Sequence, residues 1–328
     1  MFVAKLAVIG RRAMASIFLA LASVIAGPVL AESAAPKVVV TLKPVHALVS
    51  AIMEGVGTPV LLVDGAQSPH TFALKPSGAR AMAQADLFIR VSPALEAFTL
   101  KASEALPPSV SMLTLAGVPG VHVLKQRQGA LFEAHDHHDE GEVGGDHDHC
   151  GDDHVAIDGH IWLDPENAKA IVTAVTKALV ARYPESAGRF KSNAAALDAK
   201  IAKLEAELAT ELAPLNGKSF IVFHDAYHYF EARFGLQASG SITLSPEVQP
   251  SAKRLTEVRQ KIWGLGAVCV FAEPGFQPAL VAAVTEGSKA KSGTLDPEGV
   301  ALQPGPDLYF DLMRNLGRDM KACLQPLP

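Results

Sequence analysis

Residues 190–212 read FKSNAAALDAKIAKLEAELATEL, and this stretch decides the fold that we expect. Apolar side chains recur in it at steps of three or four residues, at Phe190, Ala194, Leu197, Ile201, Leu204, Leu208 and Leu212. One apolar stripe predicts a single helix, here over residues 186–213, about 40 Å long at 1.5 Å per residue. A solvent-facing coiled-coil segment would show the same stripe. We favour a rigid linker helix, because neither Gly nor Pro interrupts the stripe.

Short apolar strands alternate with helical patterns on both sides of this helix. KVVVTL, PVLLV and DLFIRV precede it, and SFIVF, AVCVF and SGTLD follow it. Alternation at this spacing predicts parallel sheets covered by helices. The sequence therefore predicts an α/β protein of two lobes, residues 32–185 and 214–328, joined by the long helix.

The first 31 residues are typical of a secretory signal peptide. Lys5, Arg11 and Arg12 precede a short apolar run, and VLA at residues 29–31 offers small side chains for cleavage. The run is too short for an uncleaved membrane anchor. We expect a periplasmic protein without a lipid anchor, because no Cys lies directly after the cleavage point.

An acidic, histidine-rich stretch lies in a disordered loop expected over about residues 125–156 of the first lobe. Residues 133–154 read EAHDHHDEGEVGGDHDHCGDDH, with nine carboxylates and no Lys or Arg. Imidazoles and carboxylates at this density bind zinc-like ions, but without apolar anchors we expect weak, exchangeable binding. The candidate accessory ligands are His135, His137, His138, His147, His149 and His154. The rest of the mature chain is nearly neutral and has no basic stripe, which argues against a nucleic-acid partner.

Three single histidines and one aspartate lie at or near the ends of predicted strands. His70 follows PVLLV, His160 precedes a helix that starts at Pro165, His224 ends SFIVFH, and Asp296 ends SGTLD. Open α/β sheets bind ligands at the carboxyl ends of their strands, and three imidazoles with one carboxylate suit Zn²⁺. Each histidine taken alone is more often structural. Together they predict a metal site.

A zinc hydrolase is the enzymatic alternative. His224 and His228 are four residues apart, the spacing of two ligands on one helix face in zinc proteases. That motif needs Glu directly after the first His as general base, and Asp225 stands there instead. We therefore expect a binding protein and not an enzyme.

Six segments, in this order, resemble the motifs of the metal-specific solute-binding proteins of bacterial ABC transporters (metal-binding cluster A-I), most closely the zinc-binding ZnuA type. They are GAQSPHTFALKPS, DGHIWLDPENA, FHDAYHYFEARFGL, SPEVQPSAKRL, VFAEPGFQPAL and GTLDP. The resemblance covers essentially the whole mature chain. It implies metal clamped between two lobes, by His70 and His160 from the first and by His224 and Asp296 from the second.

The resemblance also implies a role. We expect a monomer that captures Zn²⁺ in the periplasm and delivers it to an ABC permease in the inner membrane, with the histidine-rich loop as an accessory zinc collector. Manganese and iron members are expected to have Glu at position 224, so His224 favours zinc over manganese. A manganese-binding transport protein and a periplasmic zinc buffer without a transporter stay as alternatives. Some zinc members have an acidic residue beside the first His, where this chain has Pro69.

The sequence has three cysteines, of which two are expected to pair. Cys269 and Cys323 lie in apolar patterns, and an oxidising compartment favours a disulfide over two free buried thiols. The resemblance implies the same pairing, because the zinc branch carries a disulfide at the matching positions of its second lobe. Cys150, inside the histidine-rich stretch, is left over.

Overall fold

The computed structural model describes residues 35–65, 67–127, 132, 156–243, 245–246, 248–266, 269–276 and 278–325. Residues 35–328 form one compact unit. The predicted signal peptide and the histidine-rich stretch lie outside the described residues. Within the described residues, every helix is too short or too polar to span a membrane.

The first lobe is built on a sheet of four parallel strands among the described residues, in the spatial order β2-β1-β3-β4. The strands are β1 (Val38–Val40), β2 (Val60–Leu61), β3 (Leu87–Arg90) and β4 (Ser111–Thr114). The register pairs Val39 with Val60 on one side and with Phe88 on the other. The helices between the strands are α1 (Lys43–Ile52), α2 (Pro76–Ala83) and α3 (Leu100–Glu104). Such crossovers bring the carboxyl ends of all parallel strands to one edge of the sheet.

The second lobe repeats this arrangement, with the strand order β6-β5-β7-β8. Its strands are β5 (Phe220–His224), β6 (Ala238–Thr243), β7 (Cys269–Ala272) and β8 (Lys291–Thr294). Its helices are α6 (His228–Phe234), α7 (Ala252–Leu265), α8 (Pro278–Thr285) and α9 (Leu308–Leu324). All described strand pairs of this sheet are parallel.

Two long helices lie between the two sheets in chain order. They are α4 (Pro165–Arg182) and α5 (Ala187–Leu212). Asp164 starts α4, because its side chain accepts a hydrogen bond from the amide of Glu166 and Pro165 occupies the first helical position. Short 3-10 turns lie at Ala97–Thr99, Leu115–Gly117, Ile161–Leu163, Pro184–Ser186 and Ala213–Leu215.

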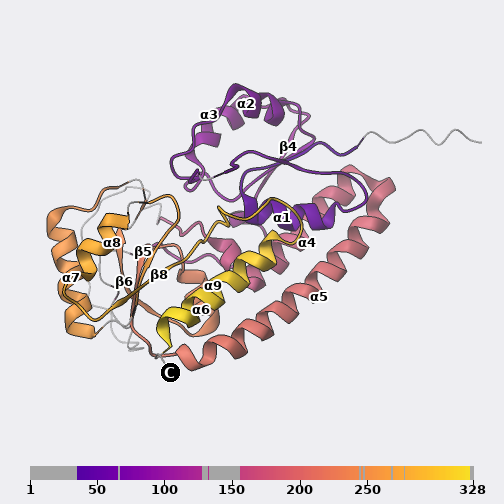
Figure 1. Ribbon diagram of the computed structural model, residues 1–328. Helices are drawn as coiled ribbons and strands as arrows, with labels where there is room; N and C mark the ends of the chain where they lie inside the picture. Colours follow the sequence, from indigo (N-terminus) through magenta and orange to yellow (C-terminus); the bar gives the residue numbers. More distant parts are fainter. Residues whose placement is uncertain are drawn as a thin grey trace, which may run out of the picture. The chain divides into compact units, whose positions relative to one another are not determined.

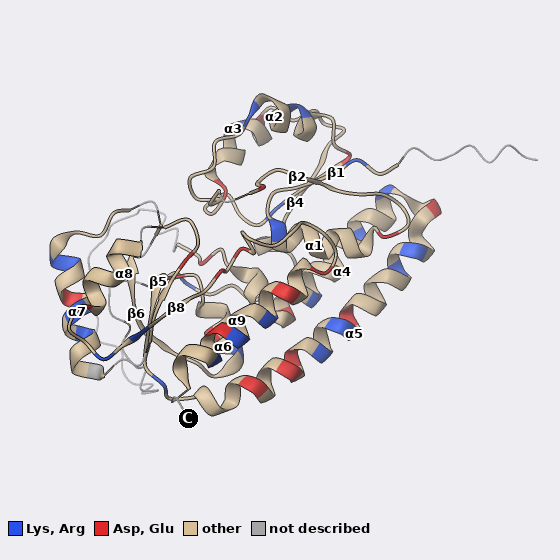
Figure 2. Cartoon of the chain, viewed as in Figure 1, with Lys and Arg blue, Asp and Glu red and all other residues tan. Residues whose placement is uncertain are grey.

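Helix α5 is the spine that the apolar stripe predicts. Phe190, Leu197, Ile201, Leu204, Leu208 and Leu212 are all buried. They pack against α1 and α4 on one lobe and α9 on the other, and Figure 1 shows α5 running beside both. Charged residues alternate with this stripe along α5 (Figure 2), and Glu205, Glu207 and Glu211 pair with Lys169 on α4 and with Arg314 and Lys321 on α9. The solvent-facing coiled-coil alternative is wrong, and the predicted fold class of two α/β lobes joined by one long helix is confirmed.

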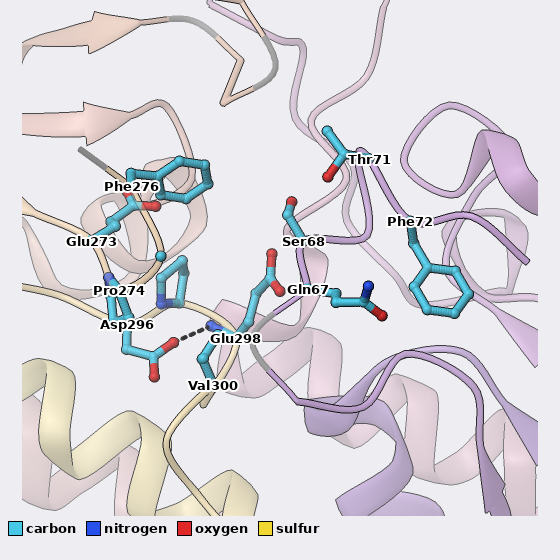
Figure 3. A pocket seen from close by; sticks show the side chains of 12 residues that line it. Gln67, Ser68, Thr71, Phe72, Glu273, Pro274, Phe276, Asp296, Glu298 and Val300 are labelled. Carbon is cyan, nitrogen blue, oxygen red and sulfur yellow. Dashed lines mark hydrogen bonds between the residues drawn. The ribbon is translucent and has the colours of Figure 1, made fainter.

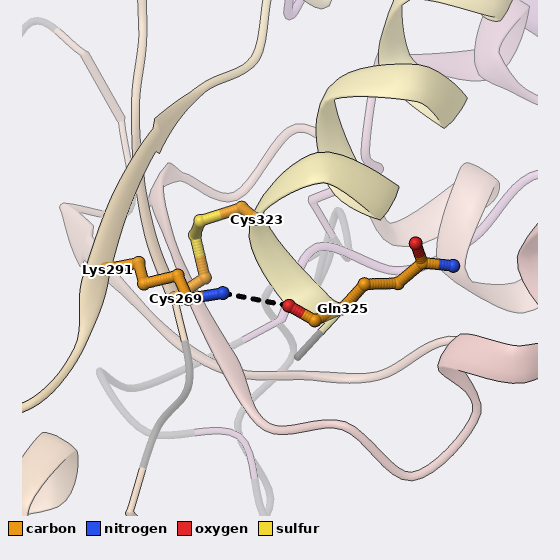
Figure 4. Close-up of a disulfide and its surroundings, with 4 residues drawn as sticks. All are labelled: Cys269, Lys291, Cys323 and Gln325. Atoms are coloured by element: carbon orange, nitrogen blue, oxygen red, sulfur yellow. Dashed lines mark hydrogen bonds between the residues drawn. A yellow bond between two sulfur atoms is a disulfide. The ribbon is translucent and has the colours of Figure 1, made fainter. Parts of the chain in front are cut away.

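A disulfide joins β7 to the C-terminal helix. Cys269 and Cys323 are bonded, with their Cα atoms 5.9 Å apart (Figure 4). Gly293 on β8 lies directly against this bond, because a Cβ atom there would approach the Sγ of Cys323 to 3.2 Å and the ring of Phe271 to 2.8 Å. Lys291 bonds the carbonyl of Gln325 beside it, at 2.8 Å. The predicted pairing of Cys269 with Cys323 is confirmed.

Candidate metal centre

Three histidines from distant parts of the sequence lie together. His70 lies in the segment after β2, His160 immediately precedes the turn Ile161–Leu163, and His224 is the last residue of β5. Each offers one ring nitrogen, and these nitrogens all lie within 4.8 Å of one another. The ring centroids are between 5.3 and 5.9 Å apart. The structure thus brings together the three histidines that the sequence singled out.

Carboxylates fix the tautomer of two of these rings. Nδ1 of His160 lies 2.7 Å from Oδ1 of Asp158, and Nδ1 of His224 lies 2.6 Å from Oε2 of Glu273. A carboxylate only accepts, so each Nδ1 carries a proton, and the nitrogen that can bind a metal ion is Nε2.

The two Nε2 atoms point at each other. The distance between Nε2 of His160 and Nε2 of His224 is 3.4 Å. When both rings are neutral, two lone pairs face each other and cannot form a hydrogen bond, so this approach is favourable only with a cation between them, either a proton or a metal ion. Nitrogen ligands 2.0–2.1 Å from a tetrahedral zinc ion are about 3.3–3.4 Å apart. The spacing therefore fits two ligands of one zinc ion.

Burial and a second layer of hydrogen bonds hold these rings in place. The exposed fractions of His160 and His224 are 4% and 2%. Glu273 also accepts from the hydroxyl of Tyr227 at 3.1 Å and from the backbone N–H of His224 at 3.3 Å. Burial raises the pKa of Tyr227 well above its ordinary value, and the charge of Glu273 adds to the shift, so this hydroxyl stays a donor. Partners of this kind orient metal ligands and raise their basicity.

Asp296 is not part of this trio. Among the described residues, the group within 4.8 Å contains the three histidines and not Asp296. Its Oδ1 accepts from the amides of Glu298 and Gly299, at 3.2 and 2.8 Å, and its Oδ2 accepts from Ala301 at 3.4 Å. The carboxylate is thus fixed within its own turn.

A cavity of about 250 Å³ is lined by Asp296 and by close neighbours of the histidines (Figure 3). Its walls include Ser68 and Thr71, which flank His70, and Glu273, which bonds His224. Asp296 and Glu298 line the same cavity. Burial raises the pKa of Glu298 well above its ordinary value, and the neighbouring charges of Glu273 and Asp296 shift it in the same direction. The cavity is therefore rich in carboxylates.

The hydrolase geometry is absent from the described residues. His224 ends β5 and His228 begins α6, so the two do not share one helix face. Asp225, in the position of a general base, binds the guanidinium of Arg127, whose Nε lies 3.0 Å from its Oδ1. The other side of Arg127 binds Glu231. Asp225 is therefore a structural ion-pair partner.

The described residues on either side of the histidine-rich stretch pair with each other. His135, His137, His138, His147, His149, His154 and Cys150 lie outside the described residues. The chain enters and leaves through an antiparallel bridge between Lys125 and Ile157, and the amide of Asp158 bonds the carbonyl of Leu124 at 3.0 Å. Asp158, the partner of His160, thus lies shortly after the histidine-rich stretch in the chain.

The chain was compared with known proteins. The family model described as "Zinc-uptake complex component A periplasmic" (ZnuA) matches residues 38–323. The chain belongs to the ZnuA family.

Curated ZnuA relatives cover most of the chain. The high-affinity zinc uptake system protein ZnuA of Brucella abortus (strain 2308) is 44% identical over 305 residues, which cover 88% of this chain and 91% of the relative. That of Yersinia pestis is 38% identical over 314 residues, which cover 94% and 96%. These ZnuA relatives are named as uptake components and not as enzymes, so the prediction that the chain is not an enzyme is confirmed.

Solved structures share the fold. A crystal structure of a ZnuA has a TM-score of 0.72 at 22% identity, over 89% of this chain and 100% of that one. Zn(II)-bound AdcA from Streptococcus pneumoniae has a TM-score of 0.67 at 22% identity, over 89% of this chain and 58% of that one.

Proposed function

We propose that this chain captures Zn²⁺ in the periplasm and delivers it to an ABC-type permease for zinc uptake. The observation that carries the proposal is the 3.4 Å approach of two Nε2 lone pairs, each fixed by a carboxylate on the opposite ring nitrogen. Such an arrangement is unfavourable without a cation and suits zinc with it. The names of the ZnuA relatives support the same cargo.

The three imidazoles bind the ion through neutral nitrogens, and Asp296 is the proposed fourth donor. This shell leaves bound Zn²⁺ with a net charge of about +1 and needs no water. A closed shell does not activate a nucleophile, which distinguishes capture from hydrolysis. Oδ2 of Asp296 accepts from one amide and keeps a second lone pair, so this oxygen can bind the ion while the carboxylate stays bonded to its turn.

The proposed zinc ion binds ligands from both lobes. His70 and His160 belong to the first lobe, and His224 and Asp296 belong to the second, so an ion shared among them stabilises the closed arrangement. The permease then recognises this closed monomer. The cleaved signal peptide directs export, and the loop histidines gather exchangeable zinc near the site.

A complementation experiment tests delivery. In cells that lack the gene, zinc uptake from depleted medium should be lost, restored by the wild-type gene, and not restored by His224→Ala. His122→Ala, which removes an exposed imidazole outside the site, is the matched control and should restore uptake. If uptake is unchanged when the gene is deleted, the protein is a zinc buffer without a transporter and the proposal fails.

A further inference from the structure

A lysine from the first lobe holds the turn that carries Asp296. Lys43 is the first residue of α1, and its exposed fraction is only 6%. Its Nζ donates to the carbonyls of Val300 at 2.9 Å, Leu302 at 3.2 Å and Gly299 at 3.5 Å. An ammonium group has three donors, so these three carbonyls use all of them.

A second first-lobe side chain binds the same turn. Nε1 of the buried Trp162 donates to the carbonyl of Pro297 at 2.9 Å. Trp162 lies two residues after His160, and the two rings have centroids 5.3 Å apart. Segment 296–302 is thus tied to the first lobe at both of its ends, and in Figure 3 its Asp296 and Glu298 form one wall of the cavity.

The position of Lys43 is unusual for a lysine with only a structural role. The first turn of a helix lies at the positive end of the helix dipole, where a cation is unfavourable. Its Nζ lies 3.8 Å from the carboxylate of the exposed Asp64, beyond hydrogen-bond distance. The carbonyls of segment 296–302 are therefore its main partners.

We propose that Lys43 is a positioning residue of the metal site, which presents Asp296 to the ion by fixing segment 296–302. The inference rests on the proposed function, because it takes Asp296 as the fourth donor. Three amides of the segment bind the Asp296 carboxylate, so carboxylate and segment move as one body. The bonds from Lys43 limit where this body can lie relative to the imidazoles.

A double-mutant cycle tests the proposal. Zinc dissociation constants of the full mature chain are measured by competition with a chelator for the wild type, Lys43→Met, Asp296→Asn and the double variant. Loss of a partner that orients a ligand typically weakens metal binding roughly 10-fold to 100-fold. We expect Lys43→Met to weaken zinc binding about 10-fold in the wild-type background and less than about twofold in the Asp296→Asn background.

Controls separate positioning from general loosening. Lys169→Met removes a half-buried lysine that pairs with Glu166 and Glu205 away from this segment, and it should leave zinc affinity unchanged. If Lys43→Met does not fold, Lys43→Arg is used, since it keeps the charge but cannot place three donors on three carbonyls.

The proposal is overturned if Lys43→Met weakens binding equally in both backgrounds, or has no effect. Failure of the proposed function looks different. In that case His224→Ala would retain tight binding of one zinc ion, whatever the Lys43 variants do.

Discussion

Hydrogen bonds to the far nitrogens set how the two buried imidazoles face the proposed zinc ion. Asp158 and Glu273 hold Nδ1–H on His160 and His224, which leaves both lone pairs on Nε2. Without those carboxylates either ring could turn its N–H toward the partner and form an ordinary hydrogen bond. The carboxylates therefore keep both Nε2 atoms directed at the position where we propose that the ion binds.

This account predicts the effect of Glu273→Gln. The amide has one acceptor oxygen for three donors, which are the hydroxyl of Tyr227 and the backbone N–H and Nδ1–H of His224. Its own N–H₂ favours the wrong tautomer of His224. Zinc affinity should fall by roughly 10-fold to 100-fold, as measured by chelator competition.

Glu286→Gln makes the same chemical change at an exposed carboxylate and is the control. It should leave the affinity unchanged. Wild-type affinity in Glu273→Gln would show that the tautomer of His224 is not set by this contact.

Sequence reasoning found the three histidines because they lie at or near strand ends. It did not find Asp158 or Glu273 as their partners, although both signals are present: Asp158 lies two residues before His160, and Glu273 follows the strand Cys269–Ala272. Which carboxylate meets which ring nitrogen depends on side-chain direction, which a linear pattern does not contain. The role of Asp296 as a donor stays a prediction.

At the scale of elements, helix α5 determines the architecture. The sequence predicts this helix because one period of 3.6 residues runs through seven apolar positions without interruption. The bounds of the short elements could not be predicted in the same way. Strand β2 has two residues and helix α3 has five, so neither shows a full period and only packing against the sheet defines them.

Ile201→Ala tests the spine. Ile201 is fully buried in the middle of α5, within the core that both lobes share. Truncation should lower the free energy of unfolding by about 2–5 kcal/mol, through lost apolar burial and the cavity left behind. Urea unfolding of the mature chain measures this change.

Lys203→Ala, at an exposed position of the same helix, is the control and should change the free energy by less than about 0.5 kcal/mol. Equal, small effects of both variants would mean that the stripe does not carry the packing between the lobes.

At the scale of the whole molecule, one hydrophobic core runs from β1 through α5 to α9. The sequence predicted two lobes, and the two sheets bear this out, but it did not show that their apolar residues form a continuous core. Nor did it show Lys43 and Trp162 reaching segment 296–302, because more than 130 residues separate the partners in each pair. Contacts at such separation appear only once the chain is folded. A shared core and these ties favour a local shift of segment 296–302 over a large hinge motion on zinc binding.

The central claim is that three scattered histidines hold the ion tightly and the histidine-rich stretch does not. Calorimetric titration of zinc into the mature chain lacking residues 133–154, with and without His224→Ala, tests it most directly. We predict that the deleted chain still binds one zinc ion tightly and that His224→Ala abolishes this binding. Loss of tight binding in the deleted chain, with retention in full-length His224→Ala, would contradict the account.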